Sequence, residues 1–354
     1  MPLVAHNSLP TFQRLRDSGQ DVLSRERARR QDIRELHIGL LNMMPDAALT
    51  ATENQFIRLV GASNQIAQFY VYPFAIPEQE RGPAALEHIE QHYFDFDALK
   101  EQGLDALIIT GANPVNPVLE NESFWDPLMA IVEWANDNVA SVLCSCLATH
   151  ALVKSRHDIE RQRLQRKQWG VYSHKIIAPE HPLTWEINTR FDAPHSRFNE
   201  VSEEQLEEAG LKVLVGSDDA GVHLAVSPDQ FRAVYFQGHP EYDAVSLLKE
   251  YKREVLRFVG DVRDTRPRFP ENYFCNAASA IASGFLRAAL KAKASGEAPP
   301  DFPETQLRAL VDNTWGDTGK AIVNNWLGLV YQYTNLDRCK QFMDGVDPDN
   351  PLGL

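Results

Sequence analysis

The stretch SVLCSCLATH, from Ser141 to His150, decides the fold. Its first half is apolar and β-friendly, and directly after the second cysteine it becomes favourable to helix. Such a change from strand to helix within a few residues is typical of an α/β protein with parallel strands. Cys144 fits inside the strand as a small apolar residue, whereas Cys146 falls at the strand end, where a sharp turn lifts a side chain above the sheet.

This position of Cys146 suits a nucleophile. The N–H groups and the dipole of the following helix favour a thiolate, and the N–H of Leu147 can donate to an oxyanion. Two buried structural cysteines are the alternative interpretation. Metal binding by Cys144, Cys146 and histidines lacks the C-x₂-C spacing of common zinc sites, so we expect no metal.

Strands alternate with helices on both sides of this stretch. LHIGLLNMM (36–44) and LDALIITG (104–111) are short apolar runs typical of buried strands, and DPLMAIVEWANDN (126–138) is typical of a helix. After Gly170, strand-like segments follow one another closely, so antiparallel strands should join the sheet there. We therefore predict an α/β fold with a mostly parallel sheet flanked by helices and with a C-terminal helical extension.

The 354 residues contain no internal repeat and no interdomain linker. We expect residues 1–260 to form the α/β domain and residues 261–354 to form a helical extension packed on the same domain. A hydrophobic content of 44% with 24% charged residues is ordinary for a globular protein. Four cysteines in a chain of this length do not make a disulfide framework.

Charge and hydropathy exclude two classes of partner. The net charge of −14 argues against general nucleic-acid binding, which needs a basic surface. The first ten residues, MPLVAHNSLP, lack the pattern of a signal peptide, and no apolar run approaches the roughly 18–20 residues of a membrane span. We expect a cytoplasmic protein without a membrane partner.

One segment is basic, although the chain as a whole is acidic. KSRHDIERQRLQRK (154–167) holds six Lys and Arg residues against two acidic residues. It is interpreted either as a solvated helix face or as a binding site for a phosphorylated ligand.

A thiolate needs a base, and His239 in VYFQGHPEYD is the best candidate. It follows a strand-like run, 232–236, and Glu241 lies two residues further on. In an extended chain the two side chains point the same way, so the carboxylate can orient the imidazole and stabilise its cation. We predict that Cys146, His239 and Glu241 form a catalytic set.

Several motifs occur along the chain in the order LNMMP, TENQFIRL, LIITGANP, the Cys146 turn, KQWGVYSH, APHSRF and GHPEYD. In these motifs the chain resembles the homoserine O-acyltransferases of methionine biosynthesis, which have a class I glutamine amidotransferase-like, flavodoxin-like fold. The likeness covers about residues 1–260, and WGDTGKAIVNNWLGLVYQYT resembles the closing helix of the family. It implies that Cys146 carries an acyl thioester, with His239 as base and Glu241 as its partner.

The same resemblance implies how substrates bind. Lys167, Ser196 and Arg253 correspond to substrate-binding positions, and Arg253 can grip an amino-acid carboxylate. The implied substrates are L-homoserine and an acyl-CoA, which is a co-substrate, so no cofactor is expected. The basic run then has the phosphates of CoA as its candidate ligand. The expected assembly is a homodimer.

The expected oxyanion hole combines two backbone N–H groups, from Leu147 and from Ala112 in the turn after Gly111. The chain departs from the family next to the nucleophile. The family often has Trp directly after the cysteine and Gln three residues later, where this chain has Leu147 and His150. The segment 277–304 is longer than the family leads us to expect, and its role stays open.

Val115 corresponds to the position linked to the choice of acyl-CoA. In the family, glutamate there accompanies acetyl transfer and glycine accompanies succinyl transfer. A glutamate would repel the free carboxylate of a succinyl group in a partly buried site, and Val115 carries no charge. We therefore expect succinyl-CoA as donor, with acetyl-CoA as the alternative, because valine is larger than glycine.

Three other functions compete with this interpretation. A glutamine amidotransferase or related thiol hydrolase would share the cysteine and the H-P-E motif, but such enzymes favour glycines where this chain has Cys144 and Ala148. A non-catalytic binding module would not need the intact Cys–His–Glu set. The third is acyl transfer to serine, which is shorter than homoserine by one methylene. One methylene changes the binding free energy in a pocket by only about 1–3 kcal/mol.

Overall fold

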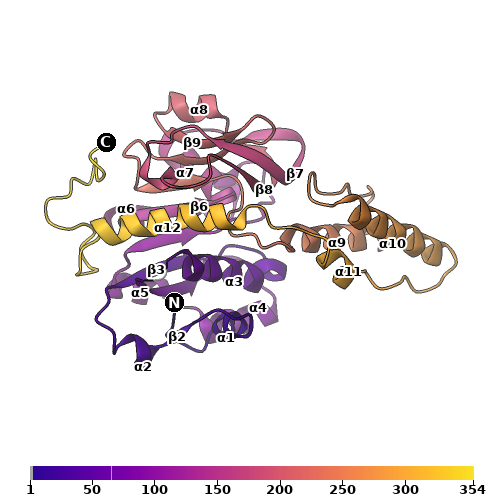
Figure 1. Cartoon of the computed structure of the whole chain (residues 1–354), viewed down its shortest axis with the longest axis horizontal. Coiled ribbons are helices and arrows are strands. Elements are labelled where there is room, and N and C mark those ends of the chain that lie inside the picture. Colours follow the sequence, from indigo (N-terminus) through magenta and orange to yellow (C-terminus); the bar gives the residue numbers. More distant parts are fainter. Residues whose placement is uncertain (1–2, 65) are drawn as a thin grey trace.

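The computed structural model describes residues 3–64 and 66–354, and within them nine strands form one sheet (Figure 1). In chain order these strands are β3 (Glu35–Leu41), β4 (Gln68–Phe74), β5 (Ala106–Ile109), β6 (Ser141–Ser145), β7 (Gln162–Ile176), β8 (Arg190–Glu200), β9 (Lys212–Ser217), β10 (Gly221–Val226) and β11 (Ala233–Phe236). Two short strands, β1 (Val4–Ala5) and β2 (Leu23–Ser24), pair in parallel as a separate small sheet.

Across the sheet the strands follow the order β4-β3-β5-β6-β11-β10-β9-β7-β8. The first five are parallel, and their order is that of flavodoxin-like folds. From β11 onward each pair is antiparallel, because β7 to β10 form hairpin-like connections. The predicted α/β class is confirmed, with parallel strands in one part of the sheet and antiparallel strands in the other.

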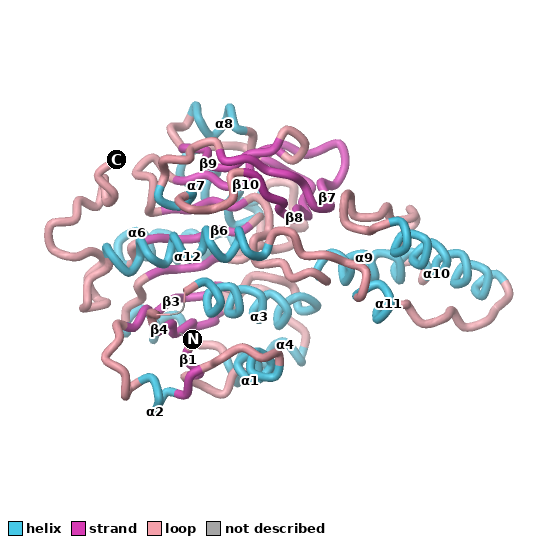
Figure 2. The backbone as a smooth tube through the Cα atoms, viewed as in Figure 1, coloured by secondary structure: helices cyan, strands magenta, loops and turns pink. Residues whose placement is uncertain are grey.

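Helices cover both faces of the sheet (Figures 1 and 2). The longer ones are α1 (Pro10–Asp17), α3 (Asp46–Ser63), α4 (Pro83–His92), α6 (Trp125–Asn138), α7 (Leu147–His157), α9 (Ser246–Val259), α10 (Asn276–Ala294) and α12 (Gly316–Tyr333). The shorter ones are α2 (Arg25–Ala28), α5 (Phe96–Gln102), α8 (Glu203–Glu208), α11 (Glu304–Arg308) and the 3₁₀ turns η1 (Leu119–Asn121) and η2 (Pro182–Thr184). No helix in the described part of the chain has both the length and the apolar character to cross a membrane.

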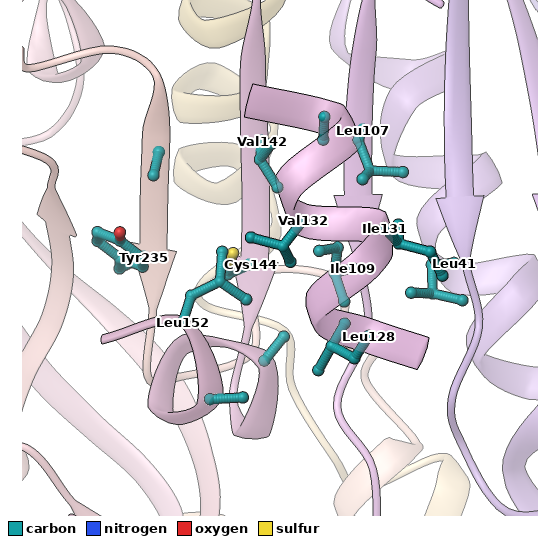
Figure 3. Close-up of a cluster of buried hydrophobic side chains, with 14 of the residues drawn as sticks. Leu41, Leu107, Ile109, Leu128, Ile131, Val132, Val142, Cys144, Leu152 and Tyr235 are labelled. Carbon is teal, nitrogen blue, oxygen red and sulfur yellow. The ribbon is translucent and has the colours of Figure 1, made fainter. Parts of the chain in front are cut away.

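Side chains along the central strands point alternately to the two faces of the sheet, so one hydrophobic core lies on each face. In β5, Leu107 and Ile109 join the core under α6 and α7, whereas Ile108 joins the core under α3 and α12. In β6, Val142 and Cys144 lie on the α6 and α7 face (Figure 3). Burial raises the pKa of the Cys144 thiol to about 12, so the predicted interior place of this cysteine is confirmed.

The chain after residue 260 separates into two parts. Helices α10 and α11 pack with α9 into an arm that projects from the sheet (Figure 1). The arm shares a third apolar cluster with Trp169 and Val171 of β7. Helix α12 returns to the sheet, where the buried Trp326 donates from Nε1 to Ser141 Oγ at 2.8 Å. A division at residue 260 stays a prediction, since α12 shares one core with the strands.

The basic run 154–167 does not form a helix face, so that interpretation is wrong. Lys154 to His157 end α7, and β7 begins at Gln162. The first residues of β7 are largely exposed and polar, so they carry no apolar alternation that would indicate a strand.

Candidate active site

Cys146 lies at the carboxyl end of β6, directly before α7. Its backbone has φ 53° and ψ −108°, a conformation that residues other than glycine rarely adopt. This strained strand–turn–helix is the geometry of a nucleophile elbow, which presents a side chain above the edge of a sheet. The side chain is partly exposed, in contrast to the buried Cys144.

The elbow is tied to the strand that leads to the predicted base. The N–H of Cys146 donates to Phe236 O, at the end of β11, at 2.8 Å. Thr149 Oγ1 donates to the same carbonyl at 2.8 Å, and the ring of His150 donates from Nε2 to Gln237 Oε1 at 3.0 Å. Burial lowers the pKa of His150 to about 3, so this ring is neutral and acts as a hydrogen-bond donor.

His239 and Glu241 form a buried pair just beyond β11. The Nδ1 of His239 lies 2.8 Å from Glu241 Oε1, and because a carboxylate only accepts, Nδ1 carries the proton. Nε2 is buried and has no hydrogen-bond partner among the described residues, and Cys146 in its thiolate form lies close enough to raise the pKa of this ring. The elbow, the base and its carboxylate are therefore brought together.

The charges in this group favour an imidazolium. Burial alone lowers the pKa of His239, but the negative charges of Glu241 and Cys146 outweigh it and raise the pKa above its ordinary value. A thiolate beside an imidazolium is the reactive form of a cysteine nucleophile.

The two predicted oxyanion donors lie beside the nucleophile. A Cβ added to Gly111 would be 3.6 Å from Cys146 Cβ, so Ala112, the next residue, lies close to the elbow. Leu147 is the first residue of α7, where the helix leaves the N–H without an intrahelical acceptor. Their role in binding an oxyanion stays a prediction.

Glu250, on α9, joins residues that were predicted separately. Its Oε2 accepts from Ser196 Oγ at 2.7 Å and from Lys167 Nζ at 3.0 Å. Its Oε1 accepts from the hydroxyl of Tyr242 at 2.7 Å, and the Tyr242 ring stacks on His239 with centroids 4.2 Å apart. Burial alone raises the pKa of Glu250, but Lys167 and the two hydroxyl donors lower it below its ordinary value, so the carboxylate is ionised.

Sequence reasoning missed both Glu250 and Tyr242. Glu250 sits in a charged helix beside other acidic and basic residues, and nothing in the pattern marks it as buried. Tyr242 directly follows the H-P-E motif, and this adjacency was the one available signal.

The structure keeps Arg253 and Val115 away from these contacts. Arg253 is half exposed, and its Nε pairs with the neighbouring Glu254 at 3.2 Å. It lies three residues after Glu250, close to one helical turn along α9. Val115 is 88% exposed in the loop after β5, so the expectation of a partly buried environment around it is wrong for the free chain.

Three buried histidines lie behind the loop that carries the base. The Nε2 atoms of His174 and His195 are 3.1 Å apart, and all three rings, including that of His223, bring a nitrogen within 4.8 Å of the others. Arg197 Nε donates to His195 Nδ1 at 3.3 Å, so the His195 proton is on Nε2 and is donated to His174. His174 in turn donates from Nδ1 to Tyr172 O at 2.8 Å. The predicted structural role of His195 is confirmed.

This arrangement fits a neutral hydrogen-bonded cluster better than a metal site. A metal ion would need a free lone pair on His195 Nε2. Because Arg197 donates to Nδ1 of this neutral ring, the proton of the ring is on Nε2, and no lone pair is free there. The cluster also supports the catalytic loop through Gly238: a Cβ there would overlap His223 Nδ1 and lie 2.9 Å from His195 Nε2. Only glycine therefore fits directly before His239.

Fold and site together are those of an α/β protein in which one thiol and one histidine–glutamate pair meet at the carboxyl ends of neighbouring parallel strands. In enzymes, a set of this kind is suited to acyl transfer through a covalent thioester. The comparisons with known proteins narrow this class.

The family model described as "HTS: Homoserine O-succinyltransferase" matches residues 2–336. Proteins named homoserine O-succinyltransferase are 60% identical in Methylococcus capsulatus and 59% identical in Methylobacter tundripaludum, each over all of both chains. Another from Allochromatium vinosum is 58% identical over all of this chain and 99% of its own. The chain belongs to the homoserine O-succinyltransferase family, so it is an acyltransferase, and the predicted family is confirmed.

Among solved structures, a glutamine amidotransferase from Thermotoga maritima is similar with a TM-score of 0.45 and 11% identity. The match covers 83% of this chain and 97% of that one.

We predict that acid destabilises the protein through the three-histidine cluster. Burial lowers the pKa of His174 to about 4 and holds the pKa values of His195 and His223 well below 6.5. The unfolded chain binds protons below about pH 6.5 and the folded chain does not, so the free energy of unfolding falls as pH drops from 6.5 towards 4. Each such histidine costs up to about 1.4 kcal/mol per pH unit in this window.

Urea unfolding at pH 7.5, 6.0 and 5.0 measures this effect. His223→Phe removes one titrating ring and keeps an aromatic side chain, so it should weaken the pH dependence. A stability that stays constant from pH 7.5 to 5.0 would show that the cluster does not stay neutral in the folded state.

We predict that Gly238→Ala disrupts the loop that carries His239. The added methyl overlaps two rings of a packed cluster, and such overpacking costs about 1–3 kcal/mol and displaces the base. Gly284→Ala is the matched control, because a Cβ there meets no atom within 4 Å and alanine favours the helix. Thermal unfolding and acyl-transfer rates are compared for both variants, and equal activity would contradict the packing role of Gly238.

Proposed function

We propose that the protein transfers the succinyl group of succinyl-CoA to the γ-hydroxyl of L-homoserine, through a thioester on Cys146. The observation that carries this proposal is the junction of Cys146, His239 and Glu241 at one edge of the sheet. Membership of the homoserine O-succinyltransferase family supports the identity of both substrates.

In the first half-reaction the Cys146 thiolate attacks the thioester carbonyl of succinyl-CoA. The N–H groups of Leu147 and Ala112 stabilise the oxyanion, and the CoA thiol leaves with a proton from His239. One thioester replaces another, so this step is nearly balanced in free energy.

In the second half-reaction homoserine replaces CoA. His239 Nε2 takes the proton of the γ-hydroxyl as that oxygen attacks the acyl-enzyme, and Glu241 stabilises the resulting imidazolium through Nδ1. The C–S bond breaks, O-succinylhomoserine leaves, and Cys146 returns to the thiolate. The same thiolate, base and oxyanion hole serve both transfers, so ping-pong kinetics follow.

The acceptor site is proposed around Glu250, Lys167 and Ser196, next to the base. Homoserine is a zwitterion, so it needs both signs of charge. Arg253 is the proposed partner of its carboxylate, and Glu250 has an acceptor position left on Oε1 for its ammonium group. Arg253 must turn inward from its exposed position to make this contact.

The basic residues at the start of β7 are proposed to bind the phosphates of CoA. Lys154 drops out of this group, because the carboxylates of Glu120, Asp158 and Glu160 already surround its ammonium. Arg163 remains exposed, and its guanidinium lies 5.7 Å from the ring centroid of Phe198, a half-exposed aromatic residue on β8.

The uncharged Val115 supports succinyl-CoA as donor, since it places no carboxylate against the acyl chain. No metal or other cofactor is needed for the proposed steps, in which acyl-CoA is a co-substrate. A homodimer in the cytoplasm is the proposed form of the enzyme.

Turnover with two donors tests the proposed function. Purified protein is given L-homoserine with succinyl-CoA or acetyl-CoA, and release of free thiol is followed. We expect higher kcat/KM with succinyl-CoA, no turnover by Cys146→Ala, and an active Cys144→Ala that loses on the order of 1 kcal/mol of stability. A preference for acetyl-CoA would refute the donor, and full activity of Cys146→Ala would refute the nucleophile.

A further inference from the structure

Arg161 holds the loop that contains Val115. It lies just before β7, and its Nη2 donates to the carbonyl oxygens of Asn116 at 3.4 Å and Pro117 at 3.1 Å. Both acceptors are neutral, so these contacts position the guanidinium without neutralising it.

The charge of Arg161 has no direct counter-ion in the described residues. Its Nη1 is shielded from solvent and has no hydrogen-bond partner there, and no carboxylate of residues 3–64 and 66–354 comes within 4.0 Å of the guanidinium. Glu122 acts on Arg161 through its charge, but its Oε1 accepts from the N–H of Asn116. A shielded cation with a free donor is costly unless a ligand completes it.

The Val115 loop links this cation to Cys146. The Val115 loop starts at Gly111, where an added Cβ would be 3.6 Å from Cys146 Cβ. Burial lowers the pKa of Arg161, whereas the negative charges of Glu122 and Cys146 act in the opposite direction. Arg161 in turn helps to lower the pKa of His150, on the helix that Cys146 begins. The loop from Gly111 to Pro117 therefore joins the two, since it lies against the elbow at its start and accepts from Arg161 at its end.

We propose that Arg161 binds the free carboxylate of the succinyl group while the acyl chain is held on Cys146. This inference rests on the proposed function and names the residue that recognises the donor's charge. The free Nη1 donates a charge-assisted hydrogen bond to a carboxylate, which favours a succinyl chain over an uncharged chain of the same length. Val115 belongs to the same loop and carries no charge that would repel a succinyl group, and Arg161 supplies the attraction.

Arg163 is the matched control, because it lies two residues further along and faces outward over Phe198. Initial rates are measured for Arg161→Met and Arg163→Met with succinyl-CoA and with butyryl-CoA, which has the same chain length and no carboxylate. For Arg161→Met we expect kcat/KM for succinyl-CoA to fall on the order of 10- to 100-fold, with less than about 3-fold change for butyryl-CoA. Arg163→Met should affect both donors equally.

Arg161→Lys keeps the positive charge and one hydrogen-bond donor for the loop, so it should retain part of the preference for succinyl-CoA. Thermal unfolding checks that each variant is folded. An equal loss for both donors in Arg161→Met would overturn the proposal, because Arg161 would then only hold the loop. No loss for either donor would overturn it as well. A wild type without preference for succinyl-CoA over butyryl-CoA would instead refute the proposed donor, which separates the two failures.

Discussion

The hydrogen bond from the N–H of Cys146 to the carbonyl of Phe236 is the contact on which the site depends. It joins the end of β6 to the end of β11, and three residues after Phe236 the chain reaches His239. Because the two strands are parallel neighbours, their carboxyl ends bring the predicted nucleophile and the predicted base to one edge of the sheet. The positive φ of Cys146 then aims the sulfur out of the strand. Without this elbow, the thiol would point into a core as Cys144 does.

Residues from the whole chain hold the base in position. Trp315, just before α12, donates from Nε1 to Tyr242 O at 2.8 Å, and Arg58 donates to Glu241 O at 3.0 Å. A Cβ on Gly319 would lie 3.0 Å from Pro240 O, so the start of α12 packs directly on the H-P-E turn. The C-terminal helix therefore supports the turn that carries His239 and Glu241, although it follows the proposed α/β domain in sequence.

Local patterns predicted the elbow, the interior place of Cys144 and the His239–Glu241 pair, because each depends on neighbours in sequence. The Glu250 junction was missed, since Lys167 and Ser196 come from two distant strands and a glutamate in a charged helix gives no sign of burial. The prediction of a helix face for the basic run 154–167 failed for a related reason. Strand β7 begins with polar, exposed residues, so the sequence of hydrophobic and polar residues there does not distinguish a strand from a helix. The exposure of Val115 depends on how its loop folds, which the residue types do not encode.

The central claim is that Cys146 carries the acyl group between two separate substrates. Isotope exchange tests it most directly: labelled CoA is incubated with succinyl-CoA and the protein in the absence of homoserine. A thioester on Cys146 predicts rapid transfer of label into succinyl-CoA, at a rate at least equal to turnover, and none with Cys146→Ala. No exchange until homoserine is added would contradict the account, because the acyl group would then pass directly from CoA to the acceptor.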